Sequence, residues 1–391
     1  MPCPSSSSQT TPSLNNPYDG SRDAFARLRV SEPFTLLDAH NIYRPSDKFF
    51  SNVIGTGNVS YLSTESAMLL STGSSGTAIR QTNKVFAYQP GKSLLVVMTF
   101  CITAGTGTHR MGFFNQNDGL FLEYSSGAAY FAKRNQGSDT KVIQSSWNVD
   151  KLDGNGPSKL VLDLTKAQIL WFDLEWLGVG NVRQGFIING QLIPCHIWYH
   201  ANYLTGVYMT SAMLPIRYEV TGTSASLKSI CSTVISEGGY NPNPLTYTIG
   251  RSAPLVNLGS AGTIVPLISL RLKSDRLYGY VTLKHIELFN SSSSDGIQWY
   301  INYGTTLSTP SWTDHPNSNL VQYDITSASM SGGRTIVGGF IDRSGSAQFD
   351  ITSIDFRIGQ SDIGVSEVLT LAAAGLANNL SAAARLVWFE L

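Results

Sequence analysis

Hydrophobic and polar positions alternate along residues 171–219, and this pattern suggests how the centre of the chain folds. Phe172 and Leu174 fall on one face of an extended backbone, whereas Asp173 and Glu175 fall on the other. A period of two residues is typical of a half-buried β-strand. We therefore predict that this stretch lies in the middle of an antiparallel sheet.

A hairpin is predicted a few residues later. Asn189-Gly190 separates the apolar pairs at 187–188 and 192–193, and Asn-Gly readily adopts the positive φ values of a two-residue type I′ turn. Strand patterns recur at short intervals from residue 47 to residue 290, and the sequence up to residue 300 has no long helical pattern. The predicted fold class is all-β: an antiparallel jelly-roll β-sandwich with an extended N-terminal arm and a small C-terminal β domain.

Composition divides the chain into three expected parts. Residues 1–45 begin with a Ser-, Pro- and Asn-rich segment and hold too few apolar side chains for a domain, so we expect an extended arm or anchor. Residues 46–292 form the predicted jelly-roll sandwich, and the polar SSSSDG segment at 291–296 is the clearest domain boundary. Residues 296–391 form the predicted small C-terminal β-sandwich.

Two segments allow more than one interpretation. Within the arm, residues 23–43 form either an N-terminal strand of the chain's own sandwich or an anchor into a neighbouring subunit. The alanine-rich segment 371–386 is helical by propensity alone, because alanine is the best helix former. Gly375 and the Asn378-Asn379 pair favour a turn between two strands, and we predict that arrangement.

The charge content suggests an assembled subunit and argues against nucleic-acid binding. Charged residues make up 14% of the chain, below the roughly 25% usual for soluble domains. Lys and Arg number 27 and are balanced by 27 Asp and Glu, so no basic excess is left to neutralise phosphates.

We expect no membrane span and no signal peptide, since neither a long apolar run nor a basic start is present. Cys101, Cys195 and Cys231 lie in apolar runs and are expected to be buried thiols, without a disulfide framework.

No enzyme motif is recognisable, and we predict a protein without catalytic activity and without a cofactor. His196 and His200 would lie two pleats apart on a strand, about 13 Å, too far to hold one zinc ion unaided. Asp173 and Glu175 could form the carboxylate pair of a glycosidase. Their commoner roles are hydrogen bonds at a strand edge or ion pairs, here with Arg183 and Arg217.

Two clusters contain side chains of the types that bind a sugar or a calcium ion. The first is the polar turn with Asn115, Asn117 and Asp118, near Tyr124 or Tyr130, although Asn and Asp are favoured in turns for backbone reasons. It lacks a full calcium-loop motif. The second is an aromatic cluster that either packs in the core or stacks on a sugar. Its members are Trp198, Tyr199, Tyr203 and Tyr208.

Several longer runs resemble a known family. The runs DGNGPS, DLTKAQI, DLEWLGVGNVR, GFIINGQLI, HANYL, VYMTSAMLPIRYE and SLKSICSTVISEGG resemble a widespread group of phage and large-DNA-virus structural proteins. The central domain of that group is a lectin-like jelly roll, similar to laminin-G and concanavalin domains. Residues 23–43 resemble the arm that often precedes this domain, and the run from SEVLTLAAAGLANN to AARLVWFEL resembles a small β tail domain.

The resemblance implies a structural component of a virion, made in the cytoplasm of a host bacterium. Its expected partners are other virion proteins and further copies of itself, as a capsid decoration, a collar, or a tail or fibre part. The arm would bury apolar side chains in a neighbouring subunit and pair its arginines with acidic groups there. The anchoring residues are Phe25, Arg27, Leu28, Arg29, Val30 and Phe34. The alternative is an adhesin that recognises a host-surface glycan through the aromatic cluster.

Overall fold

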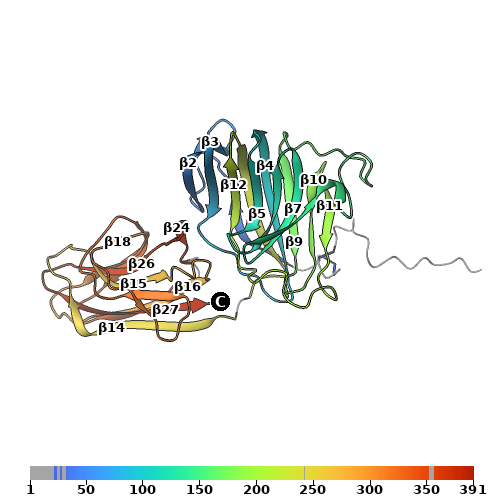
Figure 1. Cartoon of the computed structure of the whole chain (residues 1–391). Helices are drawn as coiled ribbons and strands as arrows, with labels where there is room; N and C mark the ends of the chain where they lie inside the picture. The colour runs from blue at the N-terminus through green and yellow to red at the C-terminus, as the bar shows by residue number, and fades with distance from the viewer. Residues whose placement is uncertain (1–21, 24–26, 29–31, 242, 352–355) are drawn as a thin grey trace, which may run out of the picture.

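Nearly all of the regular structure in this computed structural model is β-strand (Figure 1). The structure describes residues 22–23, 27–28, 32–241, 243–351 and 356–391. The strands form two units, each with its own hydrophobic core. One core draws on residues 37–234 and the other on residues 256–388. The predicted all-β class is confirmed.

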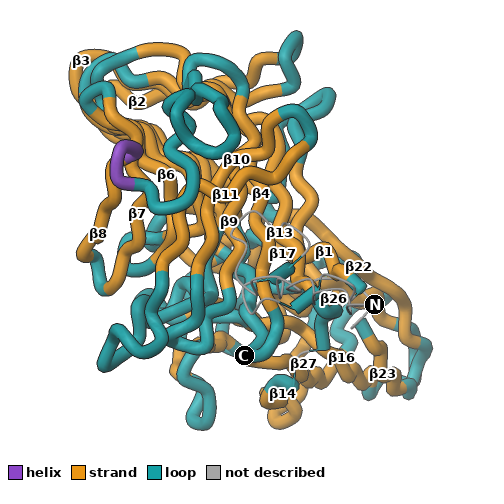
Figure 2. Tube along the Cα trace, turned by 90° about the vertical axis from the view of Figure 1, so that its right-hand side faces the viewer, coloured by secondary structure: helices purple, strands orange, loops and turns teal. Residues whose placement is uncertain are grey.

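The first unit consists of thirteen strands in one continuous antiparallel sheet. They are β1 (Pro33–Ala39), β2 (Phe49–Leu62), β3 (Ala67–Thr82), β4 (Ser93–Ala104), β5 (Thr108–Phe114), β6 (Gly119–Ser125), β7 (Ala128–Asn135), β8 (Ser138–Ile143), β9 (Gln168–Leu174), β10 (Val182–Ile188), β11 (Gln191–Trp198), β12 (Ile216–Gly222) and β13 (Ser226–Glu237). The short 3-10 helix η1 (Gln144–Ser146) follows β8, and Figure 2 shows it as the one helical segment among the described residues.

The sheet curls over into the two layers of a sandwich. Its path is β11-β10-β9-β4-β13-β3-β12-β5-β6-β7-β8, with β1 added to β13 and β2 to β3. The path turns at β3, which pairs with β13 through its first residues and with β12 through its last. Side chains from the two ends of the path then meet in the core, where Phe131 of β7 lies 6.2 Å from Phe186 of β10 between ring centroids. This arrangement confirms the predicted antiparallel jelly-roll sandwich.

The alternation seen in the sequence explains why these strands form. On β4, Leu94, Val96, Met98 and Phe100 all point into the core and are at most 1% exposed. Burying a side chain of this size contributes about 2 kcal/mol of transfer free energy. The predicted hairpin joins β10 to β11, where Ile188 pairs with Gln191 across the turn. Both turn residues have positive φ, 55° at Asn189 and 76° at Gly190, as a type I′ turn requires.

The second unit contains fourteen strands, most of them in two larger sheets. They are β14 (Leu245–Asn257), β15 (Val265–Leu272), β16 (Val281–Asn290), β17 (Ile297–Tyr303), β18 (Thr306–Leu307), β19 (Thr313–Asp314), β20 (Val321–Asp324), β21 (Met330–Ser331), β22 (Arg334–Ile341), β23 (Ser346–Asp350), β24 (Gln360–Asp362), β25 (Val365–Ser366), β26 (Leu369–Gly375) and β27 (Ser381–Glu390). The two larger sheets run β14-β27-β16-β23 and β19-β20-β15-β26-β17-β22.

The alanine-rich segment forms two strands, as predicted, and not a helix. All seven residues of β26 are buried, and its small side chains sit within the core of the second unit. Asn379, in the turn before β27, has a φ of 58°, which Asn tolerates better than most residues. Burial against the facing sheet therefore outweighs the helical propensity of alanine.

The structure divides the strands differently from the boundary expected at residues 291–296. β14, β15 and β16 precede that segment but pair with β27, β20 and β26 of the second unit. The SSSSDG segment is only the connection between β16 and β17. Its Ser-rich composition suits a turn as well as a linker, and the partners of β14 and β15 lie too far along the chain for local patterns to indicate them.

The N-terminal arm is partly a strand of the chain's own sandwich. β1 pairs with β13, with Phe34 opposite Ser236, and Leu37 enters the core at 5% exposure. This part of the arm is therefore an N-terminal strand of the chain's own sandwich, which was one of the two interpretations of the sequence. Residues 1–21, which begin the expected arm, and the anchoring residues Phe25, Arg29 and Val30 lie outside the described residues.

Candidate functional site

Two loops at one end of the first unit place an apolar surface in solvent. The loops cover residues 175–181 and 199–209, and the backbone N–H of Tyr208 donates to the carbonyl of Gly178 at 2.9 Å to join them. Tyr203 is the most exposed of the large side chains there, at 77%. We call this set of exposed residues the tyrosine surface. It consists of Leu177, Tyr199, Tyr203, Leu204 and Val207.

A stacked ring pair holds these loops from beneath. The rings of His200 and Tyr208 lie nearly parallel, with centroids 4.0 Å apart. Nδ1 of His200 lies 2.7 Å from the carbonyl oxygen of Gly180, and because a carbonyl only accepts, this nitrogen carries the proton. Burial lowers the pKa of His200 to about 4, so the ring is neutral near pH 7. The exposed tyrosines therefore rest on a packed base.

Two of the four predicted sugar-facing residues belong to that base. Tyr208 is 2% exposed and is covered by His200, so its ring face is closed to a sugar. Trp198 is 8% exposed and packs edge-on against His196 at 4.7 Å. The ammonium of Lys133 lies 5.0 Å from the centre of the Trp198 ring. Burial and the nearby Lys133 lower the pKa of His196 to about 4. Only Tyr199 and Tyr203 of the predicted four are exposed.

The remaining members of the tyrosine surface were not identified in the sequence. Leu177, Leu204 and Val207 are apolar residues in turns, where no alternation marks a face. Leu177 also has a φ of 33°, which is uncommon for a residue with a branched side chain. An apolar residue in a Gly-rich turn, as in LGVG at 177–180, is the one signal that could have indicated them.

Asp173 and Glu175 are both fully buried. Asp173 on β9 lies opposite Arg183 on β10 and forms an ion pair with it, as the structural interpretation of the sequence predicted. Glu175 accepts hydrogen bonds from the hydroxyl of Tyr88 and, at 3.2 Å, from the backbone N–H of Gly91. Burial raises the pKa of Glu175 to about 7. A glycosidase needs both carboxyls beside an open substrate site, and neither residue is so placed.

Arg27 pairs within its own chain. Its guanidinium contacts the carboxylate of Asp23 at 2.6 Å and donates to the carbonyl of Gly91 at 2.8 Å. Arg22 forms an isolated antiparallel bridge with Leu28. Arg27 thus has an internal ion pair, and its expected pairing with an acidic group of a neighbour stays a prediction. Leu28 and Phe34 remain 54% and 47% exposed, although the Phe34 ring stacks on Tyr240 at 5.6 Å.

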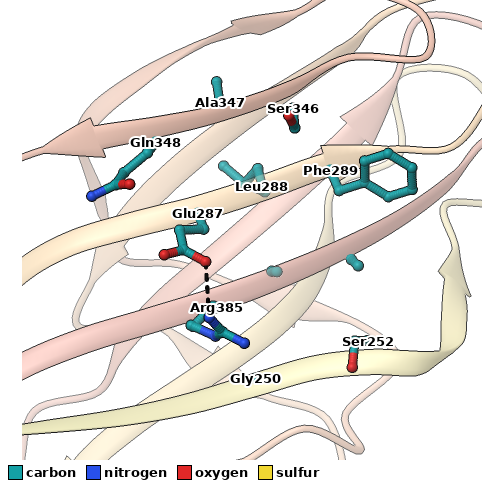
Figure 3. Close-up of a pocket in the computed structure, with 11 residues that line it drawn as sticks. Gly250, Ser252, Glu287, Leu288, Phe289, Ser346, Ala347, Gln348 and Arg385 are labelled. Carbon is teal, nitrogen blue, oxygen red and sulfur yellow. Dashed lines mark hydrogen bonds and ion pairs between the residues drawn. The ribbon is translucent and has the colours of Figure 1, made fainter.

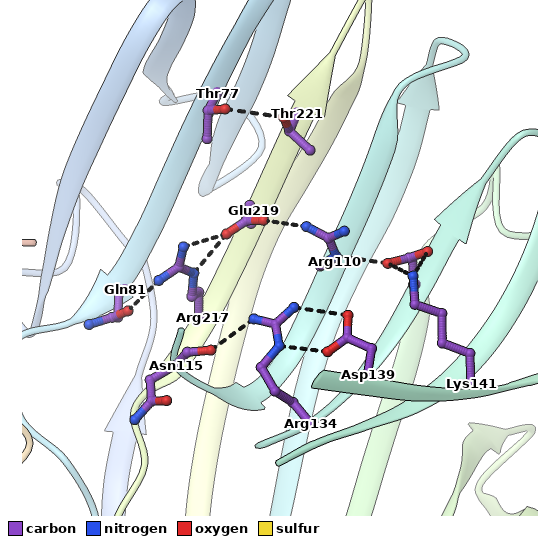
Figure 4. Close-up of polar contacts among 11 residues, drawn as sticks. Thr77, Gln81, Arg110, Asn115, Arg134, Asp139, Lys141, Arg217, Glu219 and Thr221 are labelled. Carbon is purple, nitrogen blue, oxygen red and sulfur yellow. Dashed lines mark hydrogen bonds and ion pairs between the residues drawn. The ribbon is translucent and has the colours of Figure 1, made fainter. Parts of the chain in front are cut away.

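A row of matched charges occupies the outward face of the opposite layer (Figure 4). Arg110 is its centre, because its guanidinium contacts Glu219 at 2.7 Å and Glu123 at 2.8 Å. Burial alone would raise the pKa of Glu219, but Arg217 and Arg110 outweigh it and hold that pKa below its usual value. Arg217 thus pairs with Glu219 and not with Asp173 or Glu175. We call this row the charge ladder; it runs through Gln81, Arg217, Glu219, Arg110, Glu123 and Lys141.

The polar turn at 115–118 uses its oxygens within the chain. Oδ1 of Asn115 accepts the backbone N–H groups of Asn117 and Asp118 at 2.7 and 2.8 Å, a common turn geometry. The carboxylate of Asp118 accepts from the backbone and hydroxyl of Thr210. Among the described residues, no group of three or more His, Cys, Asp or Glu side chains is placed to hold a metal ion. The turn is therefore explained by backbone capping.

The three cysteines among the described residues differ in exposure. Cys195 is buried as expected, Cys101 is half-buried, and the prediction of a buried thiol is wrong for Cys231, which is exposed. The register of β13 against β4 shifts between Ser229 and Ser232, so the alternation of buried positions changes phase there and Cys231 points to solvent. No helix in the part of the chain that the structure describes is long and apolar enough to cross a membrane.

Comparisons with known proteins give distant likenesses of the fold. No protein-family model matches the sequence, and no curated protein matches it. The carbohydrate recognition domain of Emp47p is similar over 51% of this chain and 94% of its own, with 10% identity and a TM-score of 0.34. The CBM2 module of the evolved Dit of Lactobacillus casei BL23 phage J-1 matches 54% of this chain and 99% of its own, with 8% identity and a TM-score of 0.33. A native glycosidic hydrolase matches 55% of this chain and 99% of its own, with 10% identity and a TM-score of 0.34. Similarity this distant does not decide a function.

Proposed function

We propose that this protein is a non-catalytic carbohydrate-binding component of a bacteriophage particle and that the tyrosine surface contacts the sugar. The observation that carries the proposal is the exposure of Tyr199 and Tyr203, at 54% and 77%, on loops fixed by a buried base. A sugar ring has an apolar C–H face and hydroxyl edges. A tyrosine ring can stack on the apolar face of the sugar, and the tyrosine hydroxyl can hydrogen-bond to the sugar hydroxyls. Rigid aromatic residues also lose little conformational entropy on binding.

Placement in a phage particle rests on the sequence. The blocks at 173–183, 208–219 and 230–239 resemble virion structural proteins, and the low charge content suits a subunit of an assembly. Further copies of the chain and other virion proteins are its proposed partners. In this proposal the glycan belongs to the host surface.

The experiment compares glycan binding by the full-length protein and by a Tyr199→Ala, Tyr203→Ala double variant. A glycan array identifies the sugar, and calorimetry then gives the two dissociation constants. We expect the double variant to bind about tenfold more weakly or worse, because each lost stacking contact removes about 1 kcal/mol. Tyr43→Ala is the matched control, since Tyr43 is 96% exposed elsewhere in the first unit. Equal affinity of the double variant and the wild type would rule the tyrosine surface out.

A second candidate function is structural: the arm docks on a neighbouring virion protein. The exposed apolar side chains of Leu28 and Phe34 favour it, because a partner could cover them. Removing the whole arm is a poor test, since β1 belongs to the sandwich. A Leu28→Ser, Phe34→Ser variant avoids this problem, with Val161→Ser, at a position 70% exposed, as control. Loss of incorporation into particles at an unchanged melting temperature supports docking, and normal incorporation contradicts it.

A further inference from the structure

The outward face of one sheet in the second unit contains a hollow of about 360 Å³ (Figure 3). It lies across β14, β27, β16 and β23, on the side away from the core. On β16 the side chains of Ile286 and Leu288 point into the core, at 0% and 2% exposure, while those of Glu287 and Phe289 point outward. The hollow is thus separated from the tyrosine surface, which belongs to the first unit.

One row of residues across the sheet supplies polar groups. Strand register places Gly250, Arg385, Glu287 and Gln348 side by side on successive strands. The guanidinium of Arg385 contacts the carboxylate of Glu287 at 3.2 Å, as Figure 3 shows. His285 lies 3.6 Å from the other oxygen of Glu287. This row therefore offers planar donors and acceptors whose charges largely cancel.

The next row along the strands supplies an aromatic ring with small neighbours. Phe289 pairs in register with Ala383 on one side and Ser346 on the other, and Ser252 also lines the hollow. Because these neighbours are short, they leave the Phe289 ring 43% exposed. Residues two apart on a strand lie about 7 Å from each other. One ligand ring can therefore touch both rows.

Gly250 is a glycine that the fold itself does not require. A Cβ added there would meet nothing closer than the carbonyl oxygen of Ala384 at 3.7 Å, an ordinary contact, and the residue does not have a positive φ. Glycine inside a strand weakens the strand and often marks a place where a ligand approaches the backbone closely. Its effect here is to keep the floor of the hollow open beside Arg385.

We propose that this hollow binds one unit of a neutral saccharide. The ring of Phe289 would take the apolar face of the sugar, and Arg385, Glu287 and Gln348 would hydrogen-bond its hydroxyl groups. The internal pairing of Arg385 with Glu287 disfavours a ligand with net charge of either sign, because that ligand would have to compete with the ion pair. A volume of about 360 Å³ is at the small end of ligand pockets, which suits a mono- or disaccharide better than a long peptide.

The test uses the full-length protein and saturation-transfer NMR with a panel of neutral hexoses, a deoxyhexose, N-acetylhexosamines and their disaccharides. Two variants address the site. Phe289→Ala removes the ring, and we expect about tenfold weaker binding. Gly250→Val fills the floor, and we expect loss of binding with an unchanged or raised melting temperature, because valine is favoured in strands. Phe340→Ala is the matched control, since that ring is 66% exposed on β22 of the other sheet.

The outcomes separate this site from the tyrosine surface. Binding that survives Tyr199→Ala, Tyr203→Ala but falls in Phe289→Ala and Gly250→Val supports the hollow, even if the tyrosine surface has no role. Binding that is unchanged in a folded Gly250→Val variant overturns the proposal, whatever the tyrosine variants do. The absence of any signal from the wild-type protein at sugar concentrations up to about 10 mM, a very weak affinity, also overturns it.

Discussion

At the scale of single residues, Glu175 shows how burial changes a carboxyl group that the sequence places on a polar face. The residue is fully buried next to Tyr88, and burial raises its pKa to about 7. In the unfolded chain its ordinary value is about 4.5. Between these two pH values the folded state keeps a proton on Glu175 that the unfolded chain has released. The contribution of Glu175 to stability is therefore present below about pH 4.5 and is lost as pH rises toward 7.

We predict that Glu175→Gln removes this dependence on pH. The free energy of unfolding of the wild type minus that of the variant should fall as pH rises from 4.5 to 7, measured by urea titration at each pH. The difference between wild type and variant is needed because other groups also make stability depend on pH. Burial raises the pKa of Glu367 to about 7, so Glu367 also lowers stability as pH rises. His196 and His200, with pKa values lowered to about 4, act in the opposite direction. A difference that stays flat across this range would show that Glu175 is ionised with an ordinary pKa.

The sequence predicts single residues well where they lie on strands. The pairing of Asp173 with Arg183 and the backbone role of Asn115 both follow from strand alternation and turn chemistry. The aromatic cluster was predicted only in part, because Tyr208 and Tyr203 differ in exposure, at 2% and 77%, while lying in the same loop. The path of a loop depends on contacts such as the His200 stack, and those contacts have no periodic signature.

At the scale of elements, the charge ladder joins five strands through side chains that are mostly out of water. The side chains of Arg217 and Glu219 are 5% and 10% exposed, so each depends on the other to offset its loss of hydration. An intact buried ion pair adds little to the free energy of unfolding compared with apolar residues of the same size. Removing one partner is costly, however, because it leaves a buried charge unpaired. The ladder thus supports the register of β3, β12, β5, β6 and β8.

We predict that Arg217→Met lowers the free energy of unfolding by about 3 kcal/mol, because Glu219 keeps only Arg110 as a charged partner. Thermal or urea unfolding measures the change. Adding Glu219→Gln should recover part of the loss, since the buried charge is then removed. Arg44→Met is the control, because Arg44 pairs with Asp47 at 73% and 51% exposure and should change stability by less than about 0.5 kcal/mol. A similar loss in the two single variants would contradict the role of burial.

Local patterns identify elements more reliably than they identify partners. The Asn189-Gly190 hairpin and the strands at 369–375 and 381–390 were predicted from short stretches of sequence. The pairing of β1 with β13 joins residues some 200 positions apart, and the sequence left it as one of two alternatives. Alternation indicates that a strand has a buried face, but it does not indicate which strand covers that face.

At the scale of the whole molecule, the two units have separate cores, and hydrogen bonds join one unit to the other. Arg357 donates to the carbonyl of Val85 at 2.8 Å, and the backbone N–H of Gln360 donates to the carbonyl of Asn83 at 2.7 Å. Fragments of the chain can test where it passes from one unit to the other. Pairing places it between β13, which ends at Glu237, and β14, which begins at Leu245.

We predict that the fragment 243–391 folds by itself and that the fragment 296–391 does not. The shorter fragment lacks β15 and β16, which lie inside the two larger sheets, so it exposes core residues such as Leu371 and Trp388. Circular dichroism and a urea titration should show one cooperative transition for the longer fragment and none for the shorter. The fragment 1–241 is the complementary control and should unfold cooperatively, because its core draws on residues 37–234. Cooperative unfolding of the fragment 296–391 would instead place the boundary at the Ser-rich segment, and the pairing of β14, β15 and β16 would then be dispensable for the second core.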